Sequence, residues 1–163
     1  ELAAALETLL NEEAPTPNHP PLQGDAAVLY VDGSSRGNPG AAGAGAVITD
    51  DAGQTLASLG RPVGSNTGNN TAEYAALHLG LQQLLTRYEA ETVEVRIDSM
   101  TVVRSVWGDA PAHDGCNRYN QDIIELLATT PEHDWTHLAD SDPNPADALA
   151  TVGADIATLG PGG

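Results

Sequence analysis

Four acidic residues, Asp32, Glu73, Asp98 and Asp147, each end or interrupt a segment of apolar or small residues. Asp32 closes the run VLYVD and Asp98 closes VEVRID, each where a strand would end, while Glu73 lies on the apolar stripe of a predicted helix. Oxygen ligands that carry negative charge are what Mg2+ requires. If the fold brings these four side chains together, they form a site for hard cations.

The segments that carry the acids have the periodicity of strands and helices. Three consecutive strands imply an antiparallel meander, and later strands that follow helices add in parallel. We therefore expect an α/β (α+β) domain with a mixed five-stranded sheet, three antiparallel then two parallel strands, flanked by helices. The predicted strands are 26–32, 42–51, 54–63, 92–98 and 133–138, and the predicted helices are 66–88, 99–108, 117–130 and 145–159.

The first 25 residues differ in composition from the rest. Residues 1–13 are typical of a helix, and residues 14–25 contain four prolines and read as an extended linker. We expect 1–25 to be a helical remnant of an upstream region and 26–163 to be the functional domain. No apolar run approaches 18 residues, and the start lacks a signal-peptide pattern, so we expect no membrane partner. A single Cys116 fits a reducing cytoplasm and an ordinary thiol, and we expect a monomer.

The charge balance is strongly acidic. Six basic residues, all arginine, stand against 23 acidic ones, a formal net charge of −17. Such a chain repels itself and any polyanion unless salt screens it, and the Debye length falls to roughly 3 Å in molar salt. Because the acids are spread over patterned segments, we predict a salt-adapted protein, such as one from a halophilic archaeon. Concentrated salt would also screen the repulsion between an acidic protein and nucleic acid, so the negative charge does not exclude nucleic-acid binding.

Each acidic motif also has an ordinary structural interpretation. The run DGSSRGNPG at 32–40 is typical of a turn between two strands. In the alternative interpretation, Asp32 is a metal ligand, and the glycines after it leave the backbone open to a phosphate chain. TGNNTAEY at 67–74 reads as a helix start capped by Asn or Thr, although a charged Glu73 on an apolar face is expensive without a partner. The segments IDS at 97–99 and NPADALA at 144–150 are by themselves ordinary helix starts.

Taken in order, with spacings of 41, 25 and 49 positions from one acid to the next, the four motifs resemble those of type 1 ribonuclease H. The resemblance covers about residues 26–158. It implies that Asp32, Glu73, Asp98 and Asp147 bind two divalent cations, Mg2+ or Mn2+, with Asp32 as the shared ligand. It further implies endonucleolytic cleavage of the RNA strand of an RNA–DNA hybrid, leaving 5′-phosphate and 3′-hydroxyl ends. One cation would generate hydroxide and the other would stabilise the leaving oxygen.

The resemblance also implies which residues contact the substrate. These are Gly33, Ser34, Ser35, Asn38, Asn69 and Asn70, which would read the minor groove and the 2′-hydroxyls of the RNA strand. The chain departs from the family in three places. Gly68 replaces a phosphate-binding Thr, Met100 replaces a base-contacting Gln, and residues 106–117 are short and acidic where some bacterial members carry a basic helix and loop.

His137 lies ten residues before Asp147, the spacing of a loop histidine that assists catalysis in the family. The predicted strand 133–138 offers the alternative that His137 is a structural residue. His19, His78, His113 and His133 receive no function, and Trp107, Trp135 and Tyr74 are expected in the core or at its edge.

Three other functions remain open from the sequence. One is a catalytically inactive domain of the same fold that binds nucleic acid within a larger protein. Another is an acidic cation-binding protein in which the four acids coincide by chance. The third is a nuclease of the same fold that acts on other nucleic acids.

Overall fold

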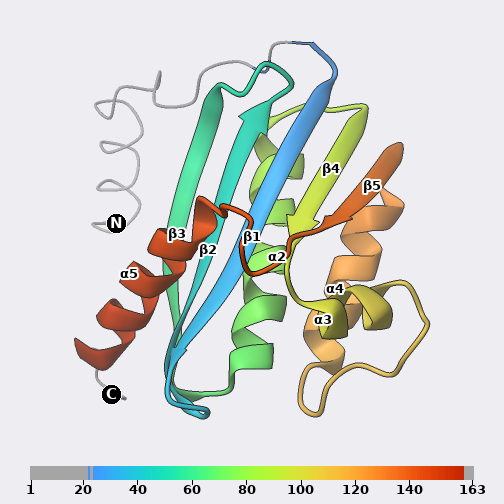
Figure 1. The fold of residues 1–163 in the computed structure, drawn as a ribbon. Helices are drawn as coiled ribbons and strands as arrows, with labels where there is room; N and C mark the ends of the chain where they lie inside the picture. The colour runs from blue at the N-terminus through green and yellow to red at the C-terminus, as the bar shows by residue number, and fades with distance from the viewer. Residues whose placement is uncertain (1–21, 23, 160–163) are drawn as a thin grey trace, which may run out of the picture.

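The computed structural model describes residue 22 and residues 24–159, so the expectations for residues 1–21 lie outside the described residues. The described part forms one five-stranded sheet in the order β3-β2-β1-β4-β5 with helices packed on it (Figure 1). Strands β1, β2 and β3 pair antiparallel, and β4 and β5 add in parallel, which confirms the predicted architecture. The elements are β1 (Ala26–Arg36), β2 (Gly40–Asp50), β3 (Thr55–Thr67), α2 (Asn69–Arg87), β4 (Thr92–Ile97), α3 (Met100–Val106), α4 (Asn117–Ala128), β5 (Glu132–His137) and α5 (Ala146–Leu159).

The glycine-rich segment after Asp32 is mostly strand, and the prediction of a turn over 33–40 was wrong in extent. Residues 33–36 continue β1 and pair with residues 41–44 of β2, so the reversal is confined to residues 37–39. Strand pairing is favoured over a longer loop because the ladder satisfies backbone N–H and C=O groups that the loop would leave without partners. As a result the β1–β2 hairpin extends well past Asp32.

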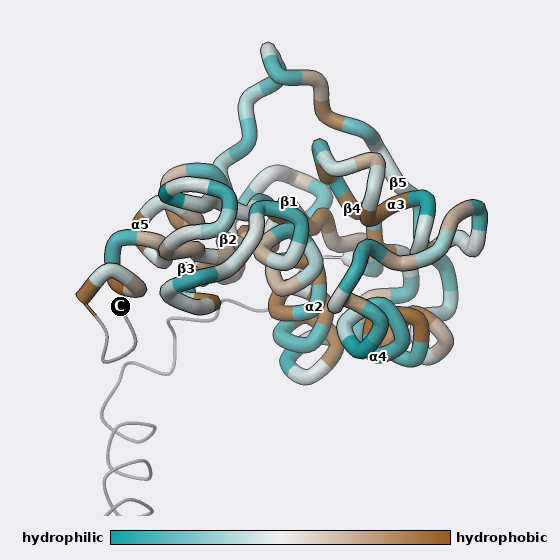
Figure 2. Tube along the Cα trace, turned by 90° about the horizontal axis from the view of Figure 1, so that it is seen from below, coloured by the Kyte–Doolittle hydropathy of each residue, from teal (hydrophilic) through white to brown (hydrophobic). Residues whose placement is uncertain are grey.

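Helices cover both faces of the sheet. A side chain added at Gly80 of α2 would meet Leu29 and Ala46, whereas glycines 43 and 45 of β2 face α5. Because successive strand residues point to opposite faces, α2 and α5 lie on opposite sides of the sheet, as Figure 2 also shows. Helix α4 packs beside α2, and α5 covers β2 and β3.

The core lies between the sheet and α2. The predicted apolar stripe of α2 is fully buried. It consists of Leu77, Leu81, Leu84 and Tyr88, the residue directly after the helix. Tyr74 is also buried and Trp135 packs against the core, as expected. Trp107 lies at the edge of the core rather than inside it: it is 53% exposed, and its ring contacts those of His133 and Trp135.

Among the described residues, no helix combines the length and the apolar composition needed to cross a membrane.

Candidate active site

Three carboxylates from three elements meet at one edge of the sheet. Asp32 of β1, Glu73 of α2 and Asp98, directly after β4, each offer an oxygen within 4.8 Å of the other two. The parallel register that pairs Tyr30 with Arg96 brings the residues two places further along, Asp32 and Asp98, to the same level. The pairing of β1 with β4 ends just before these two residues, and the carboxyl end of a parallel pair is a common place for such groups to converge.

Gly33 lets the helix bring Glu73 to this edge. A Cβ atom on Gly33 would lie 2.6 Å from the backbone nitrogen of Glu73 and 2.6 Å from the carbonyl carbon of Ala72. Only glycine allows β1 and α2 to approach so closely. The N–H of Gly33 also donates to Oδ1 of Asp32, at 3.0 Å, and orients that carboxylate.

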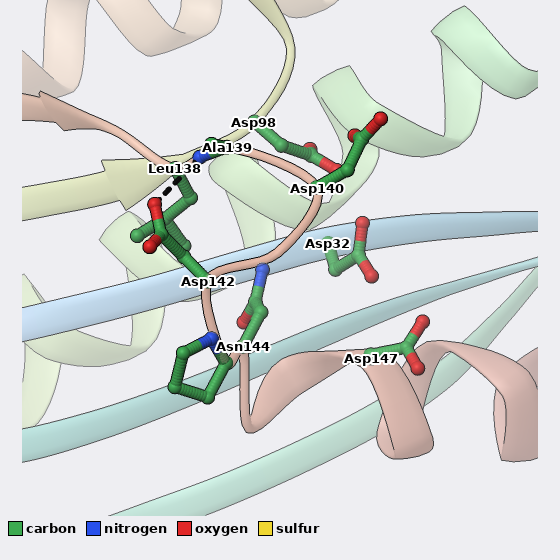
Figure 3. A pocket seen from close by; sticks show the side chains of 9 residues that line it. Asp32, Asp98, Leu138, Ala139, Asp140, Asp142, Asn144 and Asp147 are labelled. Carbon is green, nitrogen blue, oxygen red and sulfur yellow. Dashed lines mark hydrogen bonds between the residues drawn. The ribbon is translucent and has the colours of Figure 1, made fainter.

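Asp147, in the first turn of α5, approaches the cluster from another side. It is exposed, and Figure 3 shows it beyond Asp32 at the rim of the pocket. Asp147 is not among the three acids whose oxygens lie within 4.8 Å, yet it acts on Asp32 and helps to raise the pKa of that residue. The pocket, of about 370 Å³, is lined by Asp32, Asp98, Leu138, Ala139, Asp140, Asp142, Pro143, Asn144 and Asp147.

The electrostatics of the cluster favour a bound cation. Burial, followed by the charge of Asp98, raises the pKa of Glu73 to about 9. Burial, the charge of Asp98 and the contact with Asp147 raise the pKa of Asp32 to about 7. Burial also raises the pKa of Asp98. Each shift reports that the ionised carboxylates lack compensating positive charge.

The cluster also fits a divalent cation chemically. Glu73 is 5% exposed, and its Oε2 is buried with no hydrogen-bond partner in the described residues. A buried carboxylate oxygen without a partner is costly, and an oxygen ligand for a hard cation would resolve that cost. The donor set, all carboxylate, is the type that Mg2+ and Mn2+ prefer.

Asn144 is a site residue that the sequence analysis missed. Its Nδ2 donates to the carbonyl of Val31, the residue before Asp32, at 3.0 Å. Its Oδ1 accepts the N–H of Ala146 at 3.0 Å, and its own carbonyl accepts the N–H of Asp147 at 3.1 Å. Asn144 therefore ties the start of α5 to β1 beside Asp32. An Asn two residues before a helix signals a cap, but no sequence pattern reveals its bond to Val31.

The six predicted substrate contacts lie on the β1–β2 hairpin and in the first turn of α2, and three of their side chains, those of Ser35, Asn38 and Asn70, already have partners within the protein. The hydroxyl of Ser35 donates to the carbonyls of Gly37 and Thr67. The Oδ1 of Asn38 accepts the N–H of Asn69 at 3.0 Å. Asn69 and Asn70 form the first turn of α2, and Gly33 and Ser34 extend β1 past Asp32.

The start of α2 differs from the sequence prediction. The helix begins after Gly68, which makes no side-chain cap, so the expected Asn or Thr cap from within the segment is wrong. Asn38, from the β1–β2 turn, satisfies the N–H of Asn69 instead. A Cβ on Gly68 would lie 3.3 Å from Oδ1 of Asn38. A larger residue here would press on that contact, which gives a physical reason for glycine at this position.

His137 is the last residue of β5 rather than a member of the following loop. Its side chain is exposed, and Nε2 lies 3.1 Å from the carbonyl oxygen of Asp98. His137 also lowers the pKa of Asp98, against the larger effect of burial. The strand placement matches the structural alternative, while the contact brings the ring next to the acidic cluster.

Comparison with known proteins agrees with this fold and site. Residues 30–153 match the model of the Reverse transcriptase-like family. Ribonuclease HI of Halobacterium salinarum is 34% identical over 138 residues, which span 84% of this chain and 68% of that protein. A bifunctional protein of Mycobacterium tuberculosis is 43% identical over 82 residues, but only 22% of its length is covered.

Two solved structures are also similar to this chain. The crystal structure of ribonuclease H1 from Halobacterium salinarum has a TM-score of 0.73 and 32% identity, and covers 80% of this chain and 98% of its own. That of LC11 ribonuclease H1 in complex with an RNA/DNA hybrid has a TM-score of 0.71 and 32% identity, and covers 81% and 99%. The sheet order and these likenesses define a ribonuclease H-like fold.

The chain belongs to the type 1 ribonuclease H family. It is a nuclease of the hydrolase class, and the family implies dependence on a divalent metal.

The pKa shifts predict how metal and pH act together on stability. Between about pH 4.5 and 9 the metal-free folded state binds more protons than the unfolded state, since the folded pKa values of Asp32 and Glu73 are raised. The carboxylates of this site therefore lower stability as pH rises through that window. A cation needs them ionised, so the rise in Tm from EDTA to 10 mM Mg2+ should be larger at pH 8.5 than at pH 6.

Differential scanning fluorimetry at constant molar KCl measures this difference. Subtracting the EDTA curve at each pH cancels groups elsewhere in the protein. Glu73→Gln should lose most of the Mg2+ effect. A Mg2+ effect that is independent of pH would contradict the assignment of the raised pKa values to a cation site.

Proposed function

We propose that this chain hydrolyses the RNA strand of RNA–DNA hybrids at the cluster of Asp32, Glu73, Asp98 and Asp147, with Mg2+ or Mn2+ as cofactor. The observation that carries the proposal is the buried Oε2 of Glu73, which has no hydrogen-bond partner in the described part of the chain, on a carboxylate that lies within reach of two others. Membership of the type 1 ribonuclease H family supplies the reaction class. The similar LC11 enzyme was solved with an RNA/DNA hybrid bound, which supports the substrate.

The four acids would hold two divalent cations, which supply Lewis-acid stabilisation of the scissile phosphate and a readily ionised water. Asp32, which interacts with Asp98 and Asp147, is the proposed shared ligand. Asn144 holds the start of α5, and with it Asp147, against β1. The expected products carry 5′-phosphate and 3′-hydroxyl ends.

Selection of RNA requires contacts to the 2′-hydroxyl, the group that distinguishes RNA from DNA. Asn69 and Asn70 lie at the N-terminus of α2, within four residues of Glu73, and Gly33 and Ser34 directly follow Asp32 in β1. We propose that these residues, with Ser35 and Asn38, line the minor-groove side of the hybrid. Since the side-chain oxygens of Ser35 and Asn38 already bond within the protein, we expect both to orient the turn as well.

A cleavage assay tests the proposal directly. Labelled RNA–DNA hybrid, duplex RNA and duplex DNA are incubated with the protein in molar KCl, with Mg2+, Mn2+ or EDTA. We expect cleavage of the RNA strand of the hybrid only, and only with a divalent cation. Intact hybrid under all conditions, with the hybrid still bound, would favour an inactive binding domain. Equal cleavage of duplex RNA would show a broader nuclease.

We further propose that His137 assists the reaction through its position beside Asp98. A residue that transfers a proton contributes about 10²-fold or more. His137→Ala should therefore lower kcat by that factor at neutral pH and leave KM unchanged. His78→Ala, in the middle of α2 where the ring contacts Tyr119, is the matched control. An unchanged kcat in His137→Ala would leave the ring with only the structural role of bonding the Asp98 carbonyl.

Salt should stabilise the fold, because the net charge is −17 and little of it is compensated. Of the six arginines, all within the described residues, Arg36, Arg96 and Arg118 form ion pairs with Asp155, Glu94 and Asp122. Lowering the ionic strength from 1 M to 0.01 M lengthens the Debye length from about 3 Å to about 30 Å. We expect Tm, measured by circular dichroism, and the rate of hybrid cleavage to decline together on dilution of KCl.

Sucrose serves as the control for that experiment, since it favours compact states without screening charge. Sucrose in low salt should restore less Tm than KCl does. Full structure and unchanged Tm in 0.01 M KCl would remove the claim of salt adaptation.

Three further proposals complete this assignment. Residues 26–163 act as the nuclease domain and residues 1–25 as a separate segment, so a chain starting at residue 26 should retain hybrid cleavage. The protein acts in the cytoplasm, and it acts as a monomer, which light scattering in molar KCl measures.

A further inference from the structure

The loop between α3 and α4 is held against the start of α2. Gly108 and Gly115, near its two ends, both have φ of +81°, a conformation that side-chain-bearing residues adopt rarely. In the described structure this loop takes the place of the basic element that the sequence analysis found to be absent. Its residues 107–116 contain two acids, Asp109 and Asp114, and no arginine.

A buried polar network fixes the middle of this loop. Tyr74 of α2 is fully buried, and its hydroxyl lies 2.6 Å from Oγ of Ser105 in α3. The same hydroxyl accepts the backbone N–H of His113 at 3.2 Å. Ser105 also bonds Asn120 of α4 at 3.0 Å. The backbone of His113 is therefore linked to three helices through the buried Tyr74 and Ser105 and the half-buried Asn120.

A second anchor lies three residues further on. Cys116 is buried, its Sγ lies 3.4 Å from Oγ1 of Thr71, and its N–H donates to the carbonyl of His113 at 2.9 Å. Thr71 is the neighbour of Asn70 in the first turn of α2. Both anchors thus fix the loop relative to the turn that carries the proposed substrate residues.

This anchoring places the ring of His113 beside Asn70. The amide nitrogen of Asn70 lies 3.4 Å from Nδ1 and 3.5 Å from Nε2 of His113, and the side chain of His113 is exposed. When one ring nitrogen accepts from Asn70, the other carries the proton of a neutral imidazole and is free to donate. The loop thus presents one side-chain donor next to a substrate residue, between two carboxylates that cannot donate when ionised.

We propose that His113 is a substrate-binding residue, whose ring donates a hydrogen bond to a backbone phosphate oxygen of the hybrid that passes Asn70. The inference deepens the proposed function and rests on it. A chain without lysine has few donors for phosphate, and phosphate contacts fix the register of a bound duplex. His113 supplies such a contact from a segment whose charge alone would repel the hybrid.

Steady-state cleavage of a hybrid by wild type, His113→Ala and His113→Arg tests this inference. A net hydrogen bond is worth a factor of about three to ten in binding. We expect His113→Ala to raise KM by that factor with kcat within twofold, and His113→Arg to restore KM. Arginine should also steepen the dependence of log K on log salt by about one, as an added phosphate contact does.

His133→Ala, in the aromatic group at β5, is the matched control and should leave KM unchanged. A His113→Ala enzyme with wild-type KM, or an arginine variant with wild-type salt slope, would overturn the inference while wild-type cleavage upholds the proposed function. If wild type cuts no hybrid, binding of a fluorescent hybrid in EDTA, measured by anisotropy, still reports the contact: equal Kd for wild type and His113→Ala rejects it.

Discussion

Asp32→Asn is expected to lower hybrid cleavage about a thousandfold or more while the protein stays folded. Divalent cations contribute several kcal/mol to such reactions, and about 4 kcal/mol corresponds to a factor of about 10³. The substitution removes the acid that interacts with both Asp98 and Asp147. Since it also removes like-charge repulsion, Tm in EDTA at pH 8 should rise slightly. Loss of activity together with a gain in stability distinguishes a catalytic carboxylate from a structural one.

Single-turnover cleavage and thermal unfolding are the two measurements. Asp51→Asn makes the same chemical change in the exposed β2–β3 turn and should alter neither quantity appreciably. An Asp32→Asn protein that cuts the hybrid at the wild-type rate would reject the proposed site. A protein that loses activity only because it unfolds would leave a structural role for Asp32 as the correct interpretation.

Gly45→Val is expected to have the largest effect on stability. A Cβ on Gly45 would lie 2.6 Å from the backbone nitrogen of Ala150, and closer still to the carbonyl of Ala146. Neither contact can relax through a flexible side chain, so α5 must move away from β2. Overpacking of this kind costs about 3 kcal/mol or more, which lowers Tm by about 6–12 °C in a domain of this size.

The same substitution should weaken metal binding, because α5 carries Asp147. In the fraction that remains folded, we expect a smaller rise of Tm with Mg2+ than in wild type. Ala148→Val adds the same side chain on the exposed side of α5 and should cost only its helix propensity, within about 1 kcal/mol. A Gly45→Val protein as stable as Ala148→Val would show that the helix is not held against the sheet at this point.

Much of the site was predictable because its chemistry is local in the sequence. The acids Asp32 and Asp98 each follow an alternating or apolar run, and the apolar stripe of α2 identifies the face that carries Glu73, although β1 continues past Asp32 to Arg36. Strand register then brings the two aspartates together, since parallel pairing of β1 with β4 places them at the same level of the sheet. The predicted order of strands and helices was correct because periodicity is also local in the sequence, and the errors in this prediction lay at the ends of elements.

The contacts that orient the site were not predictable, because they join residues far apart in the chain. Asn38 caps α2 across 31 positions, and Asn144 bonds the carbonyl of Val31 across 113. His113 meets Asn70 across 43 positions through a loop that the sequence described only as acidic. The sequence identifies which side chains can form hydrogen bonds, but only the folded structure identifies their partners.

The sequence by itself determined the elements, the apolar faces and the four acids, since each follows from periodicity or residue chemistry within a short segment. The tertiary structure decided how far the acids converge: three lie within 4.8 Å of one another, and Asp147 stands at the rim on α5. That arrangement depends on the closeness that Gly33 and Gly45 allow between strands and helices. Helix and strand touch backbone to backbone here because the strand residue has no side chain to separate them, and only folding brings these distant segments together.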